Sequence, residues 1–171
     1  MKSLKRLNRV TGIVAALLIG TFVIQTTAYA QIGPDPQTNA RHSRIVGLWD
    51  VQVTVNTCAG GIPIAGFLAL HKYQLGGTGQ VVPATNPASL SAHMMIWNHA
   101  GGNDYQTSMK MYRFDGAGNA IGWVVVTSEV SINEAADEYT GSGMAEFFDA
   151  AGNLVGASCP SFVGTRFTGE P

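Results

Sequence analysis

Residues 49–56, WDVQVTVN, alternate strictly between apolar and polar side chains. Successive side chains of a β-strand point to opposite faces, so this segment predicts a strand with one buried face and one solvated face. The strand begins with a Gly-x-Trp, formed by Gly47 and Trp49. In a short chain, this feature at the start of the first strand favours a small closed β-barrel.

Residues 1–30 have the three parts of a secretory signal peptide. Four cations (Lys2, Lys5, Arg6 and Arg9) precede an apolar run over residues 10–24, and Ala28-Tyr29-Ala30 has the small-x-small pattern of a cleavage site. The apolar run is shorter than the roughly 20 residues that span a membrane. We therefore expect cleavage after Ala30, a secreted or periplasmic location, and no stable membrane anchor.

The mature chain is acidic. Removal of the leader's four cations leaves 6 Lys and Arg against 11 Asp and Glu, a net charge near −5. No cluster of basic residues remains to bind a phosphate backbone, so nucleic acid and anionic membranes are poor candidate partners. Residues 31–44, rich in Pro and polar residues, read as a flexible lead-in, and residues 45–171 as one barrel domain.

The domain divides into short runs separated by turn signals such as Gly76-Gly77 and residues 100–103. Clusters of Gly, Asn and Asp allow the backbone angles of tight hairpins. Residues 115–119 and 149–153 both begin with Asp and end with Gly-Asn, and we interpret them as hairpin turns because they lack the ligands of a calcium loop. The runs predict eight strands, near residues 45–57, 65–75, 78–84, 91–99, 104–114, 120–132, 137–149 and 153–168.

No segment after the leader shows a sustained helical period, and residues 133–138 read as a polar hairpin. Eight antiparallel strands leave two exposed edges unless the sheet closes on itself. A closed barrel of eight strands can also just hold one small ligand. The sequence therefore predicts an all-β, up-and-down eight-stranded barrel, with an open immunoglobulin-type sandwich as the alternative.

The two cysteines favour closure. Cys58 follows the first strand and Cys159 lies early in the last, so a disulfide would join the two strands at the seam. Such a bond is expected in an exported protein, and a loop of about 100 residues contributes about 4–5 kcal/mol in the chain-entropy model. With Cys58 opposite Cys159, Arg166 falls opposite Val51, from where its stem can lie on the Trp49 indole.

Gly47, Trp49 and Arg166 together resemble the pattern of the calycin superfamily, which includes lipocalins, fatty-acid-binding proteins, avidins and a small family of bacterial protease inhibitors. Those proteins have a Gly-x-Trp in the first strand and, in many members, an Arg late in the last strand that packs across it. The resemblance implies a lipocalin-like barrel in which these three residues are structural. The chain departs from lipocalins in its shorter length and in lacking a flanking helix, and it lacks the polar ligand set of avidins.

If odd positions point inward, as in the first strand, aromatic and methionine side chains line a soft apolar interior with a few polar groups. A bulge would exchange the two faces of a strand. On the seventh strand, Gly141, Gly143 and Ala145 share a face, where they either leave room for a ligand or relieve crowding. The candidate ligand-binding residues are Tyr73, His93, Met95, Trp97, Tyr105, Met109, Tyr139 and Phe147.

The spacing of His71, His93 and His99 fits no zinc motif, so we expect no metal and no cofactor. The most economical function is binding of a hydrophobic small molecule inside the barrel. A protein partner is an alternative, including a protease whose cleft would take residues 31–44.

Catalysis is the other alternative. The candidate acids have no matched base, and the chain has no linear catalytic motif. Cyclases such as allene oxide cyclase nevertheless work with an apolar cavity and no linear motif, so we expect binding and keep a cyclase-type enzyme open. The acids are Asp50, Asp104, Glu129 and Glu146.

Overall fold

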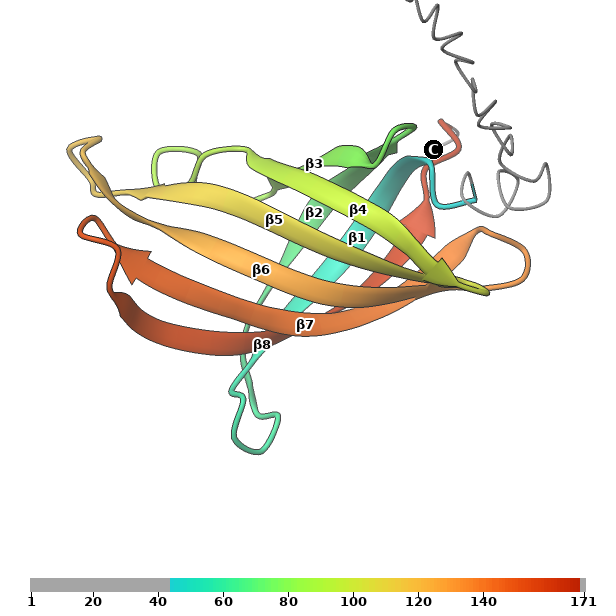
Figure 1. The fold of residues 1–171 in the computed structure, drawn as a ribbon. Helices are drawn as coiled ribbons and strands as arrows, with labels where there is room; N and C mark the ends of the chain where they lie inside the picture. Colours follow the sequence, from blue (N-terminus) through green and yellow to red (C-terminus); the bar gives the residue numbers. More distant parts are fainter. Residues whose placement is uncertain (1–43, 170–171) are drawn as a thin grey trace, which may run out of the picture. The chain divides into compact units, whose positions relative to one another are not determined.

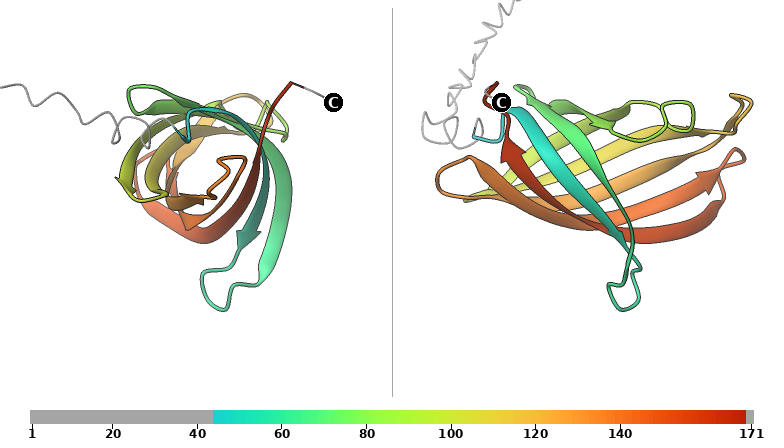
Figure 2. Two further views of the ribbon diagram at one scale, coloured as in Figure 1. Left: turned by 90° about the vertical axis from the view of Figure 1, so that its right-hand side faces the viewer. Right: turned by 180° about the vertical axis from the view of Figure 1, so that it is seen from behind.

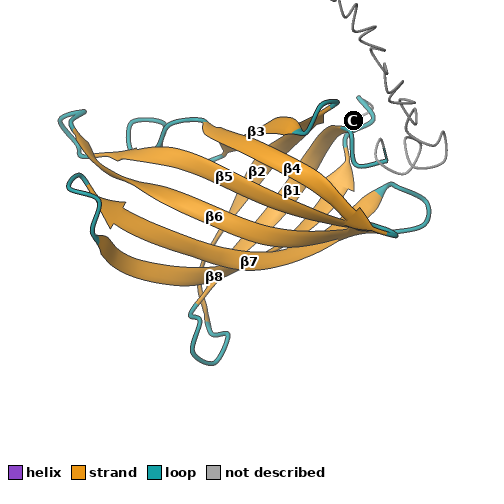
Figure 3. Ribbon diagram, in the orientation of Figure 1, coloured by secondary structure: helices purple, strands orange, loops and turns teal. Residues whose placement is uncertain are grey.

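The computed structural model describes residues 44–169, which form eight strands and no helix (Figures 1 and 3). Accordingly, no described helix is long and apolar enough to cross a membrane. The signal peptide predicted at 1–30 and nearly all of the lead-in predicted at 31–44 lie outside the described residues. The strands are β1 (Gly47–Asn56), β2 (Pro63–Gln74), β3 (Thr78–Pro83), β4 (His93–Gly101), β5 (Asp104–Phe114), β6 (Ala120–Ile132), β7 (Glu138–Asp149) and β8 (Leu154–Arg166).

Each strand pairs antiparallel with the next, and β8 pairs with β1 to close the barrel (Figure 2). The predicted all-β, up-and-down barrel is confirmed, and the closed sheet excludes the open sandwich. Every predicted strand boundary agrees with the observed one to within two residues. Closure leaves no unpaired sheet edge, which is the physical advantage that the strand count indicated.

The predicted seam disulfide is confirmed: Cys58 and Cys159 are joined, with their Cα atoms 4.9 Å apart. The predicted register is wrong by two residues, because the structure pairs Trp49 with Arg166 and Asn56 with Cys159. Cys58 lies beyond the last strand pair, in the turn after β1, so the disulfide joins a turn to a strand. Its two cysteines are therefore not directly opposite in the ladder.

The two Asp-containing turns are hairpins, as predicted, and they have the same geometry. Asp115 Oδ1 accepts hydrogen bonds from the backbone N–H of Ala117 at 2.9 Å and of Asn119 at 2.8 Å. The equivalent bonds to Asp149 Oδ1 measure 2.9 and 2.8 Å. In both turns the carboxylate is occupied in holding its own backbone, which is the role of Asp in an Asx turn.

Trp49 fills one end of the barrel. It is fully buried, and its Nε1–H donates to the carbonyl of Ile45 at 2.9 Å. The prediction placed Ile45 in the first strand, whereas it lies in the turn before β1 and is also fully buried. The Arg166 guanidinium lies over the indole, with Cζ 4.2 Å from the ring centroid. This end of the barrel is closed by side chains whose polar groups are paired.

Arg166 also explains why a glycine precedes Trp49. Its guanidinium donates to the carbonyls of Ala136 at 2.6 Å and Val46 at 2.9 Å, and to that of Arg44. A Cβ at Gly47 would lie 2.5 Å from Arg166 Nη1, and the φ angle of Gly47 is +144°. Any other residue would therefore displace the arginine that closes the seam.

Candidate functional site

The other half of the barrel contains a cavity of about 210 Å³ to which all eight strands contribute. Trp49 does not line it. The lining is largely aliphatic and aromatic, and its polar side chains are two histidines, a serine and an arginine. The cavity is lined by Val53, Val55, Phe67, His71, Val81, Leu90, His93, Met109, Met111, Arg113, Val124, Val126, Ala145, Phe147, Ser158, Pro160 and Phe162.

Three of the eight predicted ligand-binding residues, His93, Met109 and Phe147, line this cavity. The other five are buried but do not line it. Ligand contact by any of the eight stays a prediction. Sequence reasoning assigned no ligand role to Arg113, Ser158 or Phe162, because β8 turns its even positions inward and Arg113 is a charged residue at a strand end.

Four of the five remaining candidates are aromatic and pack together at the filled end. Tyr73 contacts the rings of Trp97 and Tyr139 edge-on, with centroid distances of 6.2 Å to each, and Trp97 contacts Tyr105 at 5.9 Å. The Trp97 Nε1–H is shared between the carbonyls of Thr78 and Gln74, at 2.8 and 3.1 Å. Edge-to-face packing of this kind contributes to stability beyond burial alone, so these rings have a structural role.

His71 lies between the aromatic cluster and the cavity. Its Nδ1 shares a hydrogen bond of 2.8 Å with the Tyr139 hydroxyl, and both residues are buried. Burial, with a smaller contribution from His93, lowers the pKa of His71 to about 3. Burial raises the pKa of Tyr139 well above its ordinary value. Both groups are therefore neutral at physiological pH, and the bond fixes the orientation of the His71 ring.

His93 is the unusual residue of the site. It is 4% exposed and lines the cavity, yet neither Nδ1 nor Nε2 has a hydrogen-bond partner among the described residues. Burial lowers its pKa to about 4, so the ring is neutral. A neutral imidazole has one donor and one acceptor, and leaving such groups unsatisfied in the interior costs about 1–3 kcal/mol each. Buried polar groups without a hydrogen-bond partner are rare in native proteins, so the two His93 nitrogens require an explanation.

The small residues of β7 were expected either to leave room for a ligand or to relieve crowding, and the structure shows both roles. A Cβ at Gly141 would lie 2.7 Å from the Phe162 ring, and one at Gly143 would overlap the Thr127 carbonyl oxygen. Both glycines therefore relieve crowding. Ala145 instead lines the cavity, so only this residue of the three leaves room for a ligand.

None of the candidate acids faces the cavity. Asp50, Asp104 and Glu129 are exposed, and Glu146 pairs with Val125 in an outward-facing row. Within residues 44–169, no three His, Cys, Asp or Glu side chains converge so that they could hold a metal ion. The cavity therefore brings together mostly apolar groups with two neutral imidazoles, a serine and an arginine, and no carboxylate base.

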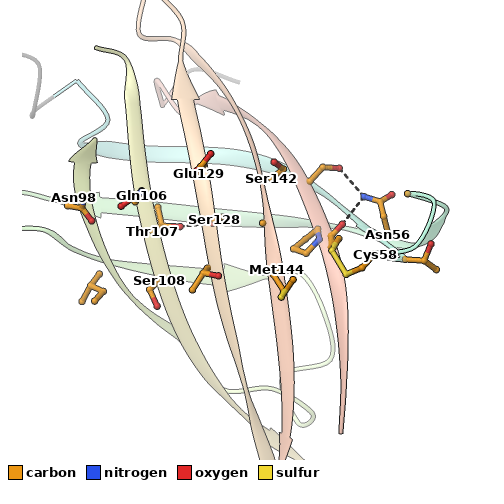
Figure 4. A pocket seen from close by; sticks show the side chains of 18 residues that line it. Asn56, Cys58, Asn98, Gln106, Thr107, Ser108, Ser128, Glu129, Ser142 and Met144 are labelled. Carbon is orange, nitrogen blue, oxygen red and sulfur yellow. Dashed lines mark hydrogen bonds between the residues drawn. A yellow bond between two sulfur atoms is a disulfide. The ribbon is translucent and has the colours of Figure 1, made fainter. Parts of the chain in front are cut away.

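A second hollow, of about 790 Å³, lies on the outer face of β4–β8, beside the turn that contains Cys58 (Figure 4). Asn98, Gln106, Glu129 and Ser142 come from four successive strands and are at least partly exposed. None of its lining side chains has a buried polar atom without a partner. This open polar groove thus lacks the unmet hydrogen-bonding capacity that His93 gives the internal cavity.

The structure defines a small closed antiparallel barrel with a disulfide at its seam and a largely apolar internal cavity. Comparison with protein-family models, with curated proteins and with solved structures gave no match.

Proposed function

We propose that this protein binds a small, mostly apolar molecule in the internal cavity. The observation that carries the proposal is His93, a residue of the largely apolar lining whose two buried ring nitrogens have no hydrogen-bond partner among the described residues. Ligand sites typically combine an apolar lining with a few polar groups that orient the ligand, and this cavity has that composition.

The cavity volume limits the size of the ligand. An engineered apolar cavity of about 150 Å³ binds benzene, and pockets for drug-sized ligands start near 300 Å³. At about 210 Å³, this cavity fits a single substituted ring or a short branched chain. It is too small to enclose a long-chain fatty acid or a retinoid.

The experiment that tests binding uses p-xylene and a variant that fills the cavity. Ligand that binds only the folded state raises the unfolding temperature with concentration, so p-xylene should raise the Tm of the wild type. Ala145→Leu places a larger side chain in the cavity and should abolish the shift, whereas Ala157→Leu, on the exposed part of β8, should preserve it. The absence of a shift with p-xylene and similar compounds would overturn the proposal.

We also propose that the protein is an exported, calycin-like barrel. The Cys58–Cys159 disulfide is expected to persist in an oxidising compartment, in agreement with a leader cleaved after Ala30. The packing of Arg166 on Trp49 supports the calycin resemblance. Mass spectrometry of the exported protein should find Gln31 at its N-terminus, and a chain that retains residues 1–30 would contradict export by cleavage.

A further inference from the structure

We infer that the ligand carries a hydroxyl group and that His93 binds this group in the cavity. The inference rests on the proposed function and adds the chemical class of the ligand. The proposed function used the volume of the cavity to limit the size of the ligand. This inference uses the hydrogen-bonding groups of the lining to select the polar group that the ligand carries.

The two ring nitrogens of His93 favour a hydroxyl over other neutral groups. A neutral imidazole offers one N–H donor and one bare nitrogen acceptor. A hydroxyl both donates and accepts, so it can satisfy whichever nitrogen faces it. A carbonyl oxygen can accept a hydrogen bond only from the N–H. A hydrocarbon can bond neither of the two ring nitrogens. The nearby His71 ring is already engaged at Nδ1 by Tyr139, which leaves His93 as the less satisfied of the two.

Charged ligand groups suit the cavity poorly. The lining contains no Asp or Glu to pair with an ammonium group. A carboxylate would be best bound by an imidazolium, but burial holds the pKa of His93 at about 4 and disfavours that form. The one formally charged lining residue is Arg113, which lies at the end of β5 with Cζ 5.7 Å from the Phe147 ring centroid.

A water molecule is a weak substitute for the ligand hydroxyl. A buried water generally makes two to four hydrogen bonds, and the lining offers few polar atoms besides the histidines. Most of the lining that includes His93 is apolar, with side chains such as Val81 and Met111. A ligand that brings its own apolar body fills this space and satisfies the ring at the same time.

The test compares three probes of one shape: p-xylene, p-cresol and p-toluate, measured by calorimetry at pH 7 on the full exported chain. One net hydrogen bond corresponds to about a fivefold gain in affinity, so p-cresol should bind about fivefold more tightly than p-xylene. p-Toluate should bind most weakly. In the wild type, the 15N resonances of the His93 ring should shift with p-cresol and shift less with p-xylene.

His93→Phe keeps a ring of similar size and removes both nitrogens, so the preference for p-cresol should vanish while p-xylene still binds. His93→Gln retains a donor and an acceptor and should keep part of the preference, which covers the case that one variant fails to fold. His99→Phe is the matched control, because His99 lies on the same strand outside the cavity and should leave the ratio unchanged.

The outcomes separate the two proposals. If none of the probes binds, the proposed function fails. If p-xylene binds as tightly as p-cresol, the cavity binds ligands but the hydroxyl inference is overturned. A bound water that already satisfies His93 would give this result. Tightest binding of p-toluate would assign recognition to Arg113, and a cresol preference that survives in His93→Phe would remove His93 from the site.

Discussion

Acid should destabilise this barrel through its two buried histidines. The pKa of His71 is lowered to about 3 and that of His93 to about 4, against 6.5 in an unfolded chain. The unfolded state therefore binds more protons than the folded state below pH 6.5. The stability that depends on neutral rings is present above pH 6.5 and is lost as the pH falls toward the folded-state pKa values.

The size of the effect follows from the two shifts. Each pKa unit corresponds to 1.36 kcal/mol, so between pH 7 and pH 4 each histidine removes about 3 kcal/mol of unfolding free energy. The sum, about 6 kcal/mol, is comparable with the whole stability of a typical domain, about 5–15 kcal/mol. His93→Phe should remove about half of this dependence. At pH 7 the same variant should be as stable as the wild type or more stable, because it removes unpartnered polar atoms.

The assay is urea denaturation followed by tryptophan fluorescence, from pH 7 to pH 4, for the wild type, His93→Phe and the His99→Phe control. Carboxylates titrate in all three proteins, so their contribution cancels in the difference between the curves. The His93→Phe curve should fall about 3 kcal/mol less than the wild-type curve over this range. Parallel curves for the wild type and His93→Phe would refute the burial of a neutral His93.

Three further predictions concern the frame around the cavity. Cys58→Ser should lower the unfolding free energy by about 4–5 kcal/mol without changing the Kd of p-xylene, and two free thiols in the native exported protein would contradict the seam disulfide. Trp49→Ala should cost about 3–5 kcal/mol in denaturant unfolding, and an unchanged midpoint would show that Trp49 is not a core residue. Gly143→Ala should cost about 1–3 kcal/mol because its Cβ would overlap the Thr127 carbonyl, whereas Gly116→Ala, in an open turn, should unfold at nearly the wild-type midpoint.

The fold could be predicted because its signals are local. The apolar–polar alternation of residues 49–56 specifies a strand, and the turns that begin with Asp and end with Gly-Asn specify hairpins. Each of these signals lies within a few consecutive residues. The register of β1 against β8 could not be derived this way, since it depends on a contact between residues more than 100 positions apart. Using the disulfide as a ladder pair placed Arg166 opposite Val51, although Cys58 lies outside the ladder.

The cavity was harder to predict than the fold. Inward parity correctly indicated that His71, His93 and Met109 are buried, but parity does not say which buried side chains contact one another and which leave space. The rings of Tyr73 and Trp97 fill their end of the barrel, and that outcome depends on rotamers and on strand tilt. On β6, apolar residues occupy both faces in the segment WVVV, so the inward position of Val124 had no sequence signal.

The polar groups at the two ends of the barrel differ in their hydrogen bonding. This difference favours the cavity end as the place where a ligand binds. At the filled end, the Trp49 indole and the Arg166 guanidinium donate to backbone carbonyls of the protein itself. At the cavity end, His93 keeps both nitrogens unpartnered in an apolar lining. Unfavourable local features, such as an unpartnered buried polar group, concentrate at functional sites, and the stability of the rest of the fold compensates for them. Because the seam disulfide and the Trp49–Arg166 contact hold the barrel closed independently of His93, substitutions at the filled end should change stability, and substitutions at His93 should change ligand preference.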